Sequence, residues 1–201
     1  MTVGITVLTS SYPEQVCKTY TLIDGAPKKR AVANVIRAQA EMIPVETAAD
    51  LVAVLREVTE SRNQVIVPGR WIDGEEPFEV ITEDELVKLL GVKGQQIEGG
   101  VHNVSGRRVA ARVKRSIINS EWTLFDADDP EGMPPEWRGM PTPERLEMFE
   151  TILPGISKCE RVELRSSSAR VSDKGTFGGA SHVYIRLSDP AKLEIIRGYV
   201  K

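Results

Sequence analysis

Residues 122–130 read Trp-Thr-Leu-Phe-Asp-Ala-Asp-Asp-Pro, an apolar run that ends in closely spaced carboxylates. The run predicts a buried strand over Trp122–Asp126, and the alternation of side chains along a strand places Asp126 and Asp128 on one face. Two carboxylates held together repel each other, and a divalent cation such as Mg²⁺ or Mn²⁺ between them removes the repulsion. A solvated loop at a strand end has the same pattern, so the residues alone leave both interpretations open.

The elements around this run indicate a second half in which strands and helices are mixed. The expected elements are strands at Arg107–Ile118, Arg161–Arg165 and His182–Leu187, a helix capped by Thr142 with Pro143 at its first position, and a final helix from Asp189. The helix after Thr142 has a core face formed by Leu146, Phe149 and Leu153.

The first hundred residues indicate a smaller unit of strands and helices. Strands are expected at Gly4–Leu8, Lys18–Ile23 and Val65–Val67. Helices are expected after Thr47, which forms a capping pair with Asp50, and at Thr82–Leu90, which Gly91 ends. Residues 31–45 fit neither pattern clearly, because they are rich in alanine but interrupted by proline. We therefore expect an α/β (α+β) protein with an N-terminal α/β unit at 1–100 and a second unit at 101–201, joined by the glycine-rich segment 95–106.

Composition narrows the protein class. The chain has 201 residues, of which 41% are hydrophobic and 27% charged, as in ordinary globular domains. No apolar run approaches the roughly 18 residues of a membrane span. The two cysteines are too few for a disulfide framework, and the N-terminus lacks the features of a signal peptide. A cytoplasmic protein without a membrane partner is the expectation.

Charge is distributed unevenly along the chain. The net charge is −3, yet residues 107–115 carry five basic residues and no acid, whereas residues 121–150 carry nine acids and two bases. On a strand, Arg108, Arg112 and Lys114 would share one face and could follow the phosphates of a nucleic acid. A solvated edge strand protected by charge explains the run equally well.

A second candidate site follows the predicted strand at residues 161–165. It contains Arg165-Ser-Ser-Ser168 and, further on, Gly178-Gly-Ala-Ser181-His182-Val-Tyr-Ile-Arg-Leu187. Serine, histidine and arginine donate hydrogen bonds to phosphate oxygens, and small residues let backbone amides approach them. Each feature by itself is more often structural or solvated.

The two sites together resemble the archaeo-eukaryotic primase superfamily. Its first motif, an apolar run ending in Asp-x-Asp, matches Leu124–Asp128, and its second, Ser-x-His, is matched only loosely by Ser181-His182. The chain is also similar to large primase-like proteins of phages, plasmids and integrative elements. This wider resemblance rests on Leu8, Lys18–Gly25, Met133-Pro134, Arg165 with Ser167, and Gly178–Tyr184.

The resemblance implies a metal-dependent nucleotidyltransferase built on an RRM-like β-α-β sheet. Asp126 and Asp128 would hold the catalytic Mg²⁺ or Mn²⁺, and His182 would contact the triphosphate of the incoming nucleotide. Ser181, Arg165 and Ser167 are the further candidates for phosphate contacts. The implied partners are nucleoside triphosphates, a DNA template, and a helicase domain or C-terminal remainder of the same protein.

One departure from the superfamily concerns its third motif, a carboxylate on a strand beyond the second motif. No such strand precedes Lys201, which leaves either a truncated protein, the explanation that we favour, or a binding module that keeps nucleotide or template contacts without turnover. We expect the chain as it stands to bind nucleotide weakly and to polymerise little. Glu163 is the first residue to examine as a substitute ligand.

Two other enzyme classes also use an apolar strand that ends in Asp-x-Asp. A phosphatase-type hydrolase would have threonine or valine, and usually glycine, soon after the second aspartate, where this chain has Asp129-Pro130. A sugar-nucleotide transferase would have an early nucleotide-binding α/β half, which the first hundred residues do not resemble.

Overall fold

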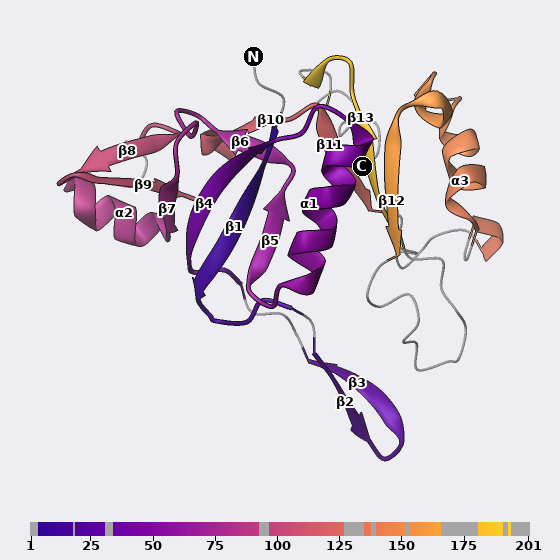
Figure 1. The fold of residues 1–201 in the computed structure, drawn as a ribbon, viewed down its shortest axis with the longest axis horizontal. Helices are drawn as coiled ribbons and strands as arrows, with labels where there is room; N and C mark the ends of the chain where they lie inside the picture. The colour runs from indigo at the N-terminus through magenta and orange to yellow at the C-terminus, as the bar shows by residue number, and fades with distance from the viewer. Residues whose placement is uncertain are drawn as a thin grey trace. The chain divides into compact units, whose positions relative to one another are not determined.

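The chain adopts an α+β fold in a computed structural model, which confirms the predicted class (Figure 1). The structure describes residues 4–17, 19–30, 34–92, 97–126, 135–137, 140–151, 153–165, 181–190 and 193. Two compact units are present. Unit 1 comprises residues 1–17 and 31–120, and unit 2 comprises residues 18–30 and 121–201.

Unit 1 is built on a six-stranded sheet in the order β5-β1-β4-β7-β9-β8. Its strands are β1 (Gly4–Tyr12), β4 (Arg37–Pro44), β5 (Gln64–Val67), β7 (Phe78–Ile81), β8 (Val101–Val104) and β9 (Arg107–Ala111). All neighbours are antiparallel except β7 and β9. Because β8 and β9 pair into this sheet, the first unit extends past residue 100, and the units divide between Ser120 and Glu121.

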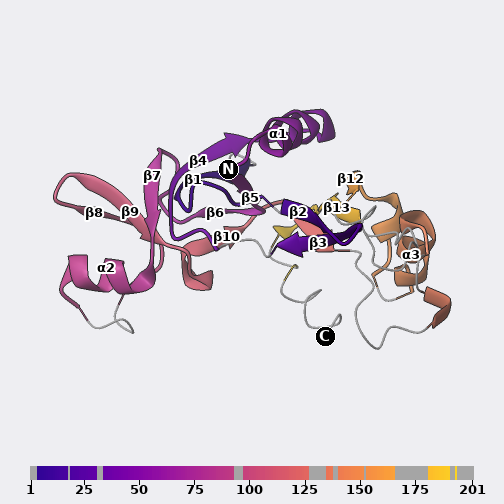
Figure 2. The ribbon, with the colours of Figure 1, turned by 90° about the horizontal axis from the view of Figure 1, so that it is seen from below.

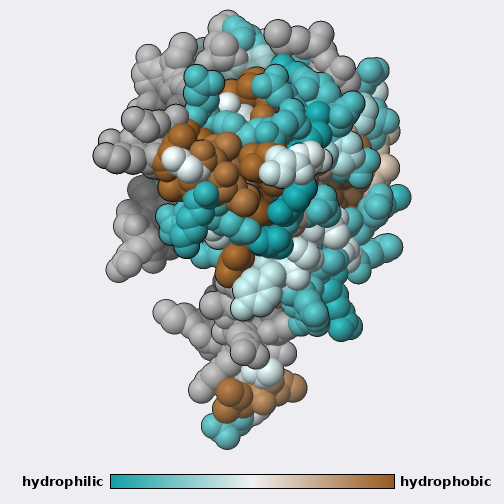
Figure 3. Space-filling view, turned by 90° about the vertical axis from the view of Figure 1, so that its left-hand side faces the viewer, coloured by the Kyte–Doolittle hydropathy of each residue, from teal (hydrophilic) through white to brown (hydrophobic). Residues whose placement is uncertain are grey.

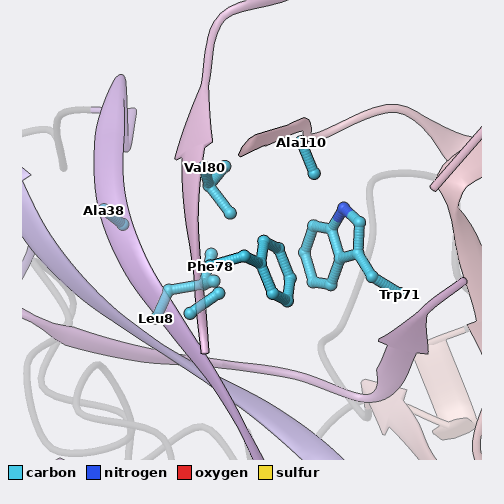
Figure 4. Close-up of a cluster of buried hydrophobic side chains, with 7 residues drawn as sticks. Leu8, Ala38, Trp71, Phe78, Val80 and Ala110 are labelled. Carbon is cyan, nitrogen blue, oxygen red and sulfur yellow. The ribbon is translucent and has the colours of Figure 1, made fainter. Parts of the chain in front are cut away.

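The interior of unit 1 is centred on a tryptophan (Figure 4). Trp71 lies on β6 (Gly69–Trp71), is 2% exposed, and packs against Phe78 with ring centroids 5.5 Å apart. Its indole Nε1 donates to the carbonyl of Ala111 at 3.2 Å. Leu8, Ala38, Ala40, Val80 and Ala110 complete the cluster. The cluster thus contains residues from β6 and from four strands of the sheet, and it packs β6 against that sheet.

Two helices accompany the sheet of unit 1, α1 (Ala48–Glu60) near β5 and α2 (Glu83–Leu90) near β9 (Figure 2). Thr47 caps α1 in a reciprocal pair with Asp50, as predicted, because each side chain accepts the backbone N–H of the other. Gly91, with φ of 66°, ends α2 in the left-handed conformation that favours glycine. Among the described residues, no helix is long and apolar enough to cross a membrane.

The predicted strand at Arg107–Ile118 is wrong. Strand β9 ends at Ala111, a single 3₁₀ turn follows at Lys114–Ser116, and a separate strand β10 (Ile117–Asn119) pairs with β6 in a two-stranded sheet. Tertiary pairing overrides the local propensity here, since β9 joins β7 whereas β10 joins a strand outside that sheet.

Unit 2 contains a three-stranded antiparallel sheet in the order β11-β13-β12. The strands are β11 (Trp122–Asp126), β12 (Arg161–Arg165) and β13 (Ser181–Arg186). Both β11 and β12 run antiparallel to β13, so they are parallel to each other, and α3 (Thr142–Phe149) connects them. This is a split β-α-β arrangement, with the third strand inserted between the first two (Figure 1).

Residues 18–30 of unit 2 include a two-stranded ribbon of β2 (Thr19–Ile23) and β3 (Ala26–Arg30). Asp24 and Gly25 form its turn, and both have positive φ, 54° and 78°. Two consecutive positive φ values define the type I′ turn that matches the twist of a hairpin.

The helix α3 packs on the sheet of unit 2 as its sequence predicts, but its cap differs. Leu146 is buried, and Phe149 and Leu153 pack against the same cluster. Thr142 is the first helical residue rather than the cap, and Pro141 precedes it without a side-chain cap bond. Two short 3₁₀ helices, Pro135–Trp137 and Ile156–Lys158, flank α3 in the chain.

Glu150 anchors the chain where α3 ends, which leads to a prediction on pH dependence. Its carboxylate accepts hydrogen bonds from the Ser157 N–H at 3.0 Å, the Ser157 hydroxyl at 2.7 Å and the Gly155 N–H, and these bonds lower its pKa. A carboxylate with a lowered folded-state pKa stabilises the fold above its unfolded pKa of about 4.3 and loses that contribution as pH falls through the folded value.

We therefore expect Glu150→Gln to lower the free energy of unfolding at neutral pH, with the difference from the parent chain shrinking below about pH 4. Urea denaturation across this pH range measures it. Glu147→Gln, an exposed change on the same helix, is the control. A Glu150→Gln deficit that stays constant down to acid pH would contradict the prediction.

Candidate functional site

The structure places two predicted site residues opposite each other on neighbouring strands. Asp126, the last residue of β11, pairs with His182 of β13 in the antiparallel ladder. Directly opposed positions of such a pair belong to the same face of the sheet, on strands about 4.7–4.9 Å apart. A nucleoside triphosphate is longer than this spacing, so one ligand can reach both positions. His182 is half-buried.

The face that carries Asp126 and His182 is the one that faces away from α3. Phe125 and Val183, the neighbours of the pair along each strand, belong to the opposite face and pack with α3. The rings of Phe125 and Phe149 meet edge to face, 5.2 Å apart. The helix therefore occupies one side of the sheet and supports the strands from behind, while the candidate site lies on the other side.

Next to the pair, the site face is apolar. Leu124, Tyr184 and Val162 form the adjacent row of the ladder, and Leu164 lies opposite His182 on β12. Tyr184 is 6% exposed, and its burial raises the pKa of the phenol. Val162 is also 6% exposed, whereas Leu124 is 37% exposed, so water is excluded from the part of the row on β12 and β13. Exclusion of water strengthens electrostatic interactions with a charged ligand. Only the strand register reveals this row.

An ion-pair cluster around Arg186 lies at the other end of the same face. Its guanidinium contacts Glu121 and Glu160, each at 3.1 Å, and lies 6.0 Å from the ring centre of Trp122. These contacts raise the pKa of Arg186, with the hydrogen bond to Glu160 as the largest cause. Because its guanidinium is paired with two carboxylates, Arg186 is not available to bind a phosphate.

The other predicted phosphate contacts are placed differently. Arg165 and Ser181 pair with each other at the same end of the sheet, one step along the ladder from the pair of Leu164 and His182. Neighbouring positions along a strand belong to opposite faces. Ser167 and Asp128 lie outside the described residues. Among the described candidates, His182 is thus the one that shares a face with Asp126.

Glu163, the substitute ligand suggested by its position before Arg165, does not belong to this site. It is exposed and pairs with Val183, and so lies on the face opposite to His182. A carboxylate on the other side of the sheet cannot join Asp126 around one metal ion. Sequence spacing alone misses this because it does not reveal the register of β12 against β13.

The basic run at residues 107–115 is not a continuous phosphate-binding face. Arg108 is on β9, Arg112 follows the strand, and Lys114 begins the 3₁₀ turn, so the prediction that the three share one strand face is wrong. Three arginines of the run also form ion pairs with acidic residues of β7, of α2 and of the segment before β7. Its ion pairs are Arg107 with Glu79, Arg108 with Glu76, and Arg115 with Glu83.

Glu79 is the centre of this ion-pair network. Its side chain is 15% exposed and contacts Arg107 of β9 on one side and Arg37 of β4, at 2.8 Å, on the other. Arg37 also contacts Glu85 of α2. The arginines therefore hold three neighbouring strands and a helix together, and the charge available to an external phosphate is small.

The donors at the candidate site suit a divalent cation that prefers oxygen. Asp126 supplies a carboxylate at the strand end, and Asp128 would supply a second. Over the described part of the chain, no group of three or more potential metal-ligating side chains is present.

No family model, curated protein or solved structure matches this chain. We therefore assign a function from the geometry of the site.

Proposed function

We propose that unit 2 carries a metal-dependent nucleotidyltransferase centre of the primase–polymerase type. The observation that carries the proposal is the pairing of Asp126 with His182 on the face opposite to α3. A carboxylate for the metal and an imidazole for the triphosphate then lie within reach of one nucleotide. The split β-α-β order of β11, α3, β12 and β13 supports an RRM-like sheet, which the resemblance implies.

Each residue has a distinct task in this proposal. Asp126, with Asp128, would hold Mg²⁺ or Mn²⁺, which when bound neutralises charge on the triphosphate and assists in-line displacement by a 3′-hydroxyl. His182 would donate a hydrogen bond to a phosphate oxygen and orient the nucleotide along β13. The buried Tyr184 would exclude water beside the reacting groups.

The proposal includes the partners and setting that the sequence predicts. Nucleoside triphosphates and a DNA template are the substrates, and the cytoplasm is the proposed location. A helicase domain in the same protein stays a prediction. A module that binds nucleotide or template without turnover is the alternative, and binding measured apart from nucleotide addition distinguishes the two.

The test of the site is the variant His182→Ala. We expect its affinity for a nucleoside triphosphate in the presence of Mn²⁺ to fall about tenfold, because a hydrogen bond to a charged phosphate contributes about 1.5–3 kcal/mol. Isothermal titration with and without Mn²⁺ measures the change.

The matched control is His102→Ala. His102 lies on β8 of unit 1, where its Nε2 contacts the carbonyl of Glu98 at 3.1 Å, and its loss should leave nucleotide binding unchanged. Equal affinities for His182→Ala and His102→Ala would refute the role of His182.

A further inference from the structure

The connection between β1 and β4 is much longer than these strands need. They are antiparallel neighbours, and Tyr12 pairs with Arg37 where the connection leaves and returns to the sheet. A loop of two to five residues usually joins such strands, as a general rule for hairpins, and structureless loops beyond about 12–15 residues are uncommon unless they have a function. This connection runs from residue 13 to residue 36 and contains the β2–β3 ribbon.

The ribbon is a built element rather than a loose loop. Five residues of β2 pair in register with five of β3, and the two-residue turn Asp24-Gly25 has the backbone conformation of a type I′ hairpin. In the described sheets, β2 and β3 pair only with each other. A ribbon of this form can enter a groove as one body.

Large apolar side chains are exposed at the end of the ribbon. Leu22 is 77% exposed and Ile23 is 44% exposed, and neither belongs to a core cluster of the described residues. The hydrophobic end of the ribbon is visible at the bottom of Figure 3. Two neighbouring apolar side chains beside a turn are therefore accessible to a partner.

Positive charge is concentrated in the same segment. Residues 18–30 contain four basic residues, Lys18, Lys28, Lys29 and Arg30, and a single acid, Asp24, in a chain whose net charge is −3. Lys18 precedes β2 in the chain, and the other three basic residues belong to β3.

We infer that the β2–β3 ribbon binds double-stranded DNA by entering its major groove. That groove admits a two-stranded ribbon, and phosphates line both of its walls, which suits a segment with four basic residues and a single acid. Leu22 and Ile23 at the tip would contact base edges, where the thymine methyl group offers an apolar partner. An anionic membrane surface fits less well, because it meets one face of an amphipathic element.

This inference does not rest on the nucleotide site of unit 2. A DNA-binding ribbon would hold a duplex whether or not Asp126 binds a metal ion. It also concerns a different basic segment from the run at 107–115, in which Arg107, Arg108 and Arg115 are ion-paired.

The test compares two variants that remove the same charge. Lys28→Ala/Lys29→Ala/Arg30→Ala changes the ribbon, and Arg56→Ala/Arg62→Ala/Lys88→Ala changes exposed basic residues of unit 1. Fluorescence anisotropy with a short labelled DNA duplex gives the affinity of each at several salt concentrations. We expect the ribbon variant to bind at least about tenfold more weakly than the control. Its salt slope should fall by about 0.9 for each phosphate that the ribbon no longer neutralises.

A second variant, Leu22→Ser/Ile23→Ser, keeps the charge and removes the apolar tip. It should weaken duplex binding without changing the salt slope, and circular dichroism should show unchanged folding because both side chains are exposed. Three outcomes would overturn the inference: equal duplex affinity of the ribbon and control variants, a preference for single-stranded over duplex DNA, or binding of the parent chain to anionic phospholipid vesicles but not to duplex.

Discussion

The variant Asp126→Ala is expected to lose the metal-dependent part of nucleotide binding, a drop of about a hundredfold in the affinity for Mn²⁺–nucleotide. Loss of residues that merely support metal ligands typically costs about 10–100-fold in metal affinity, so loss of a ligand itself should reach the upper end. Isothermal titration in the presence and absence of Mn²⁺ measures both affinities. Without the metal, Asp126→Ala and the parent chain should bind nucleotide equally weakly.

Glu163→Ala is the matched control for this change. It removes the same charge from the same sheet, but Glu163 is exposed on the face opposite to His182 and should not affect metal or nucleotide. If Glu163→Ala weakened binding as much as Asp126→Ala, the effect would come from net charge and not from a site. If neither variant changed the Mn²⁺ dependence, the proposed metal centre would be refuted.

The variant Trp71→Ala should cause the largest loss of stability. Removing a fully buried aromatic side chain costs about 3–5 kcal/mol, because the transfer free energy is lost and a cavity remains. Trp71 is 2% exposed and packs on Phe78, so its truncation leaves a buried cavity. Small domains have total stabilities of about 5–15 kcal/mol, so the variant is expected to be close to unfolding at 37 °C as a rough guide.

Two further variants separate the contributions of Trp71. Trp71→Phe keeps an aromatic ring but loses the hydrogen bond to the Ala111 carbonyl, and should cost less than Trp71→Ala. Leu89→Ala, at a side chain that is 40% exposed, should cost little. Urea denaturation followed by far-ultraviolet circular dichroism gives the free energy of unfolding of each. A loss for Trp71→Ala no larger than that for Leu89→Ala would contradict the central place of Trp71 in the core.

The sequence predicted local elements well where the signal came from neighbouring residues. The reciprocal cap of Thr47 and Asp50, the stop of α2 at Gly91, and the strand Trp122–Asp126 are confirmed, because capping bonds and alternation act within a few residues. Residues 37–44, part of the segment that fitted neither helix nor strand, form β4 in the interior of the sheet. There, pairing with β1 and β7 outweighs the helix propensity of alanine.

Predictions that depended on distant partners were less accurate. The strand expected at Arg107–Ile118 breaks after Ala111 because β9 and β10 pair with different strands. Three arginines of the same segment form ion pairs with Glu76, Glu79 and Glu83, which are far away in the sequence. Charge counted along the chain does not show which acids fold back onto it.

By itself, the sequence determined which segments form strands and helices around Asp126 and His182, and it indicated a carboxylate and an imidazole as the reactive groups. Tertiary structure decided that these two residues are partners, and that Glu163, Arg165 and Ser181 occupy positions on the other face. The reason is that side chains alternate along a strand, so a shift of one residue in the register of β12 or β13 would exchange the faces. That register is set by packing of Phe125, Val183 and Ile185 against α3, which no local pattern contains.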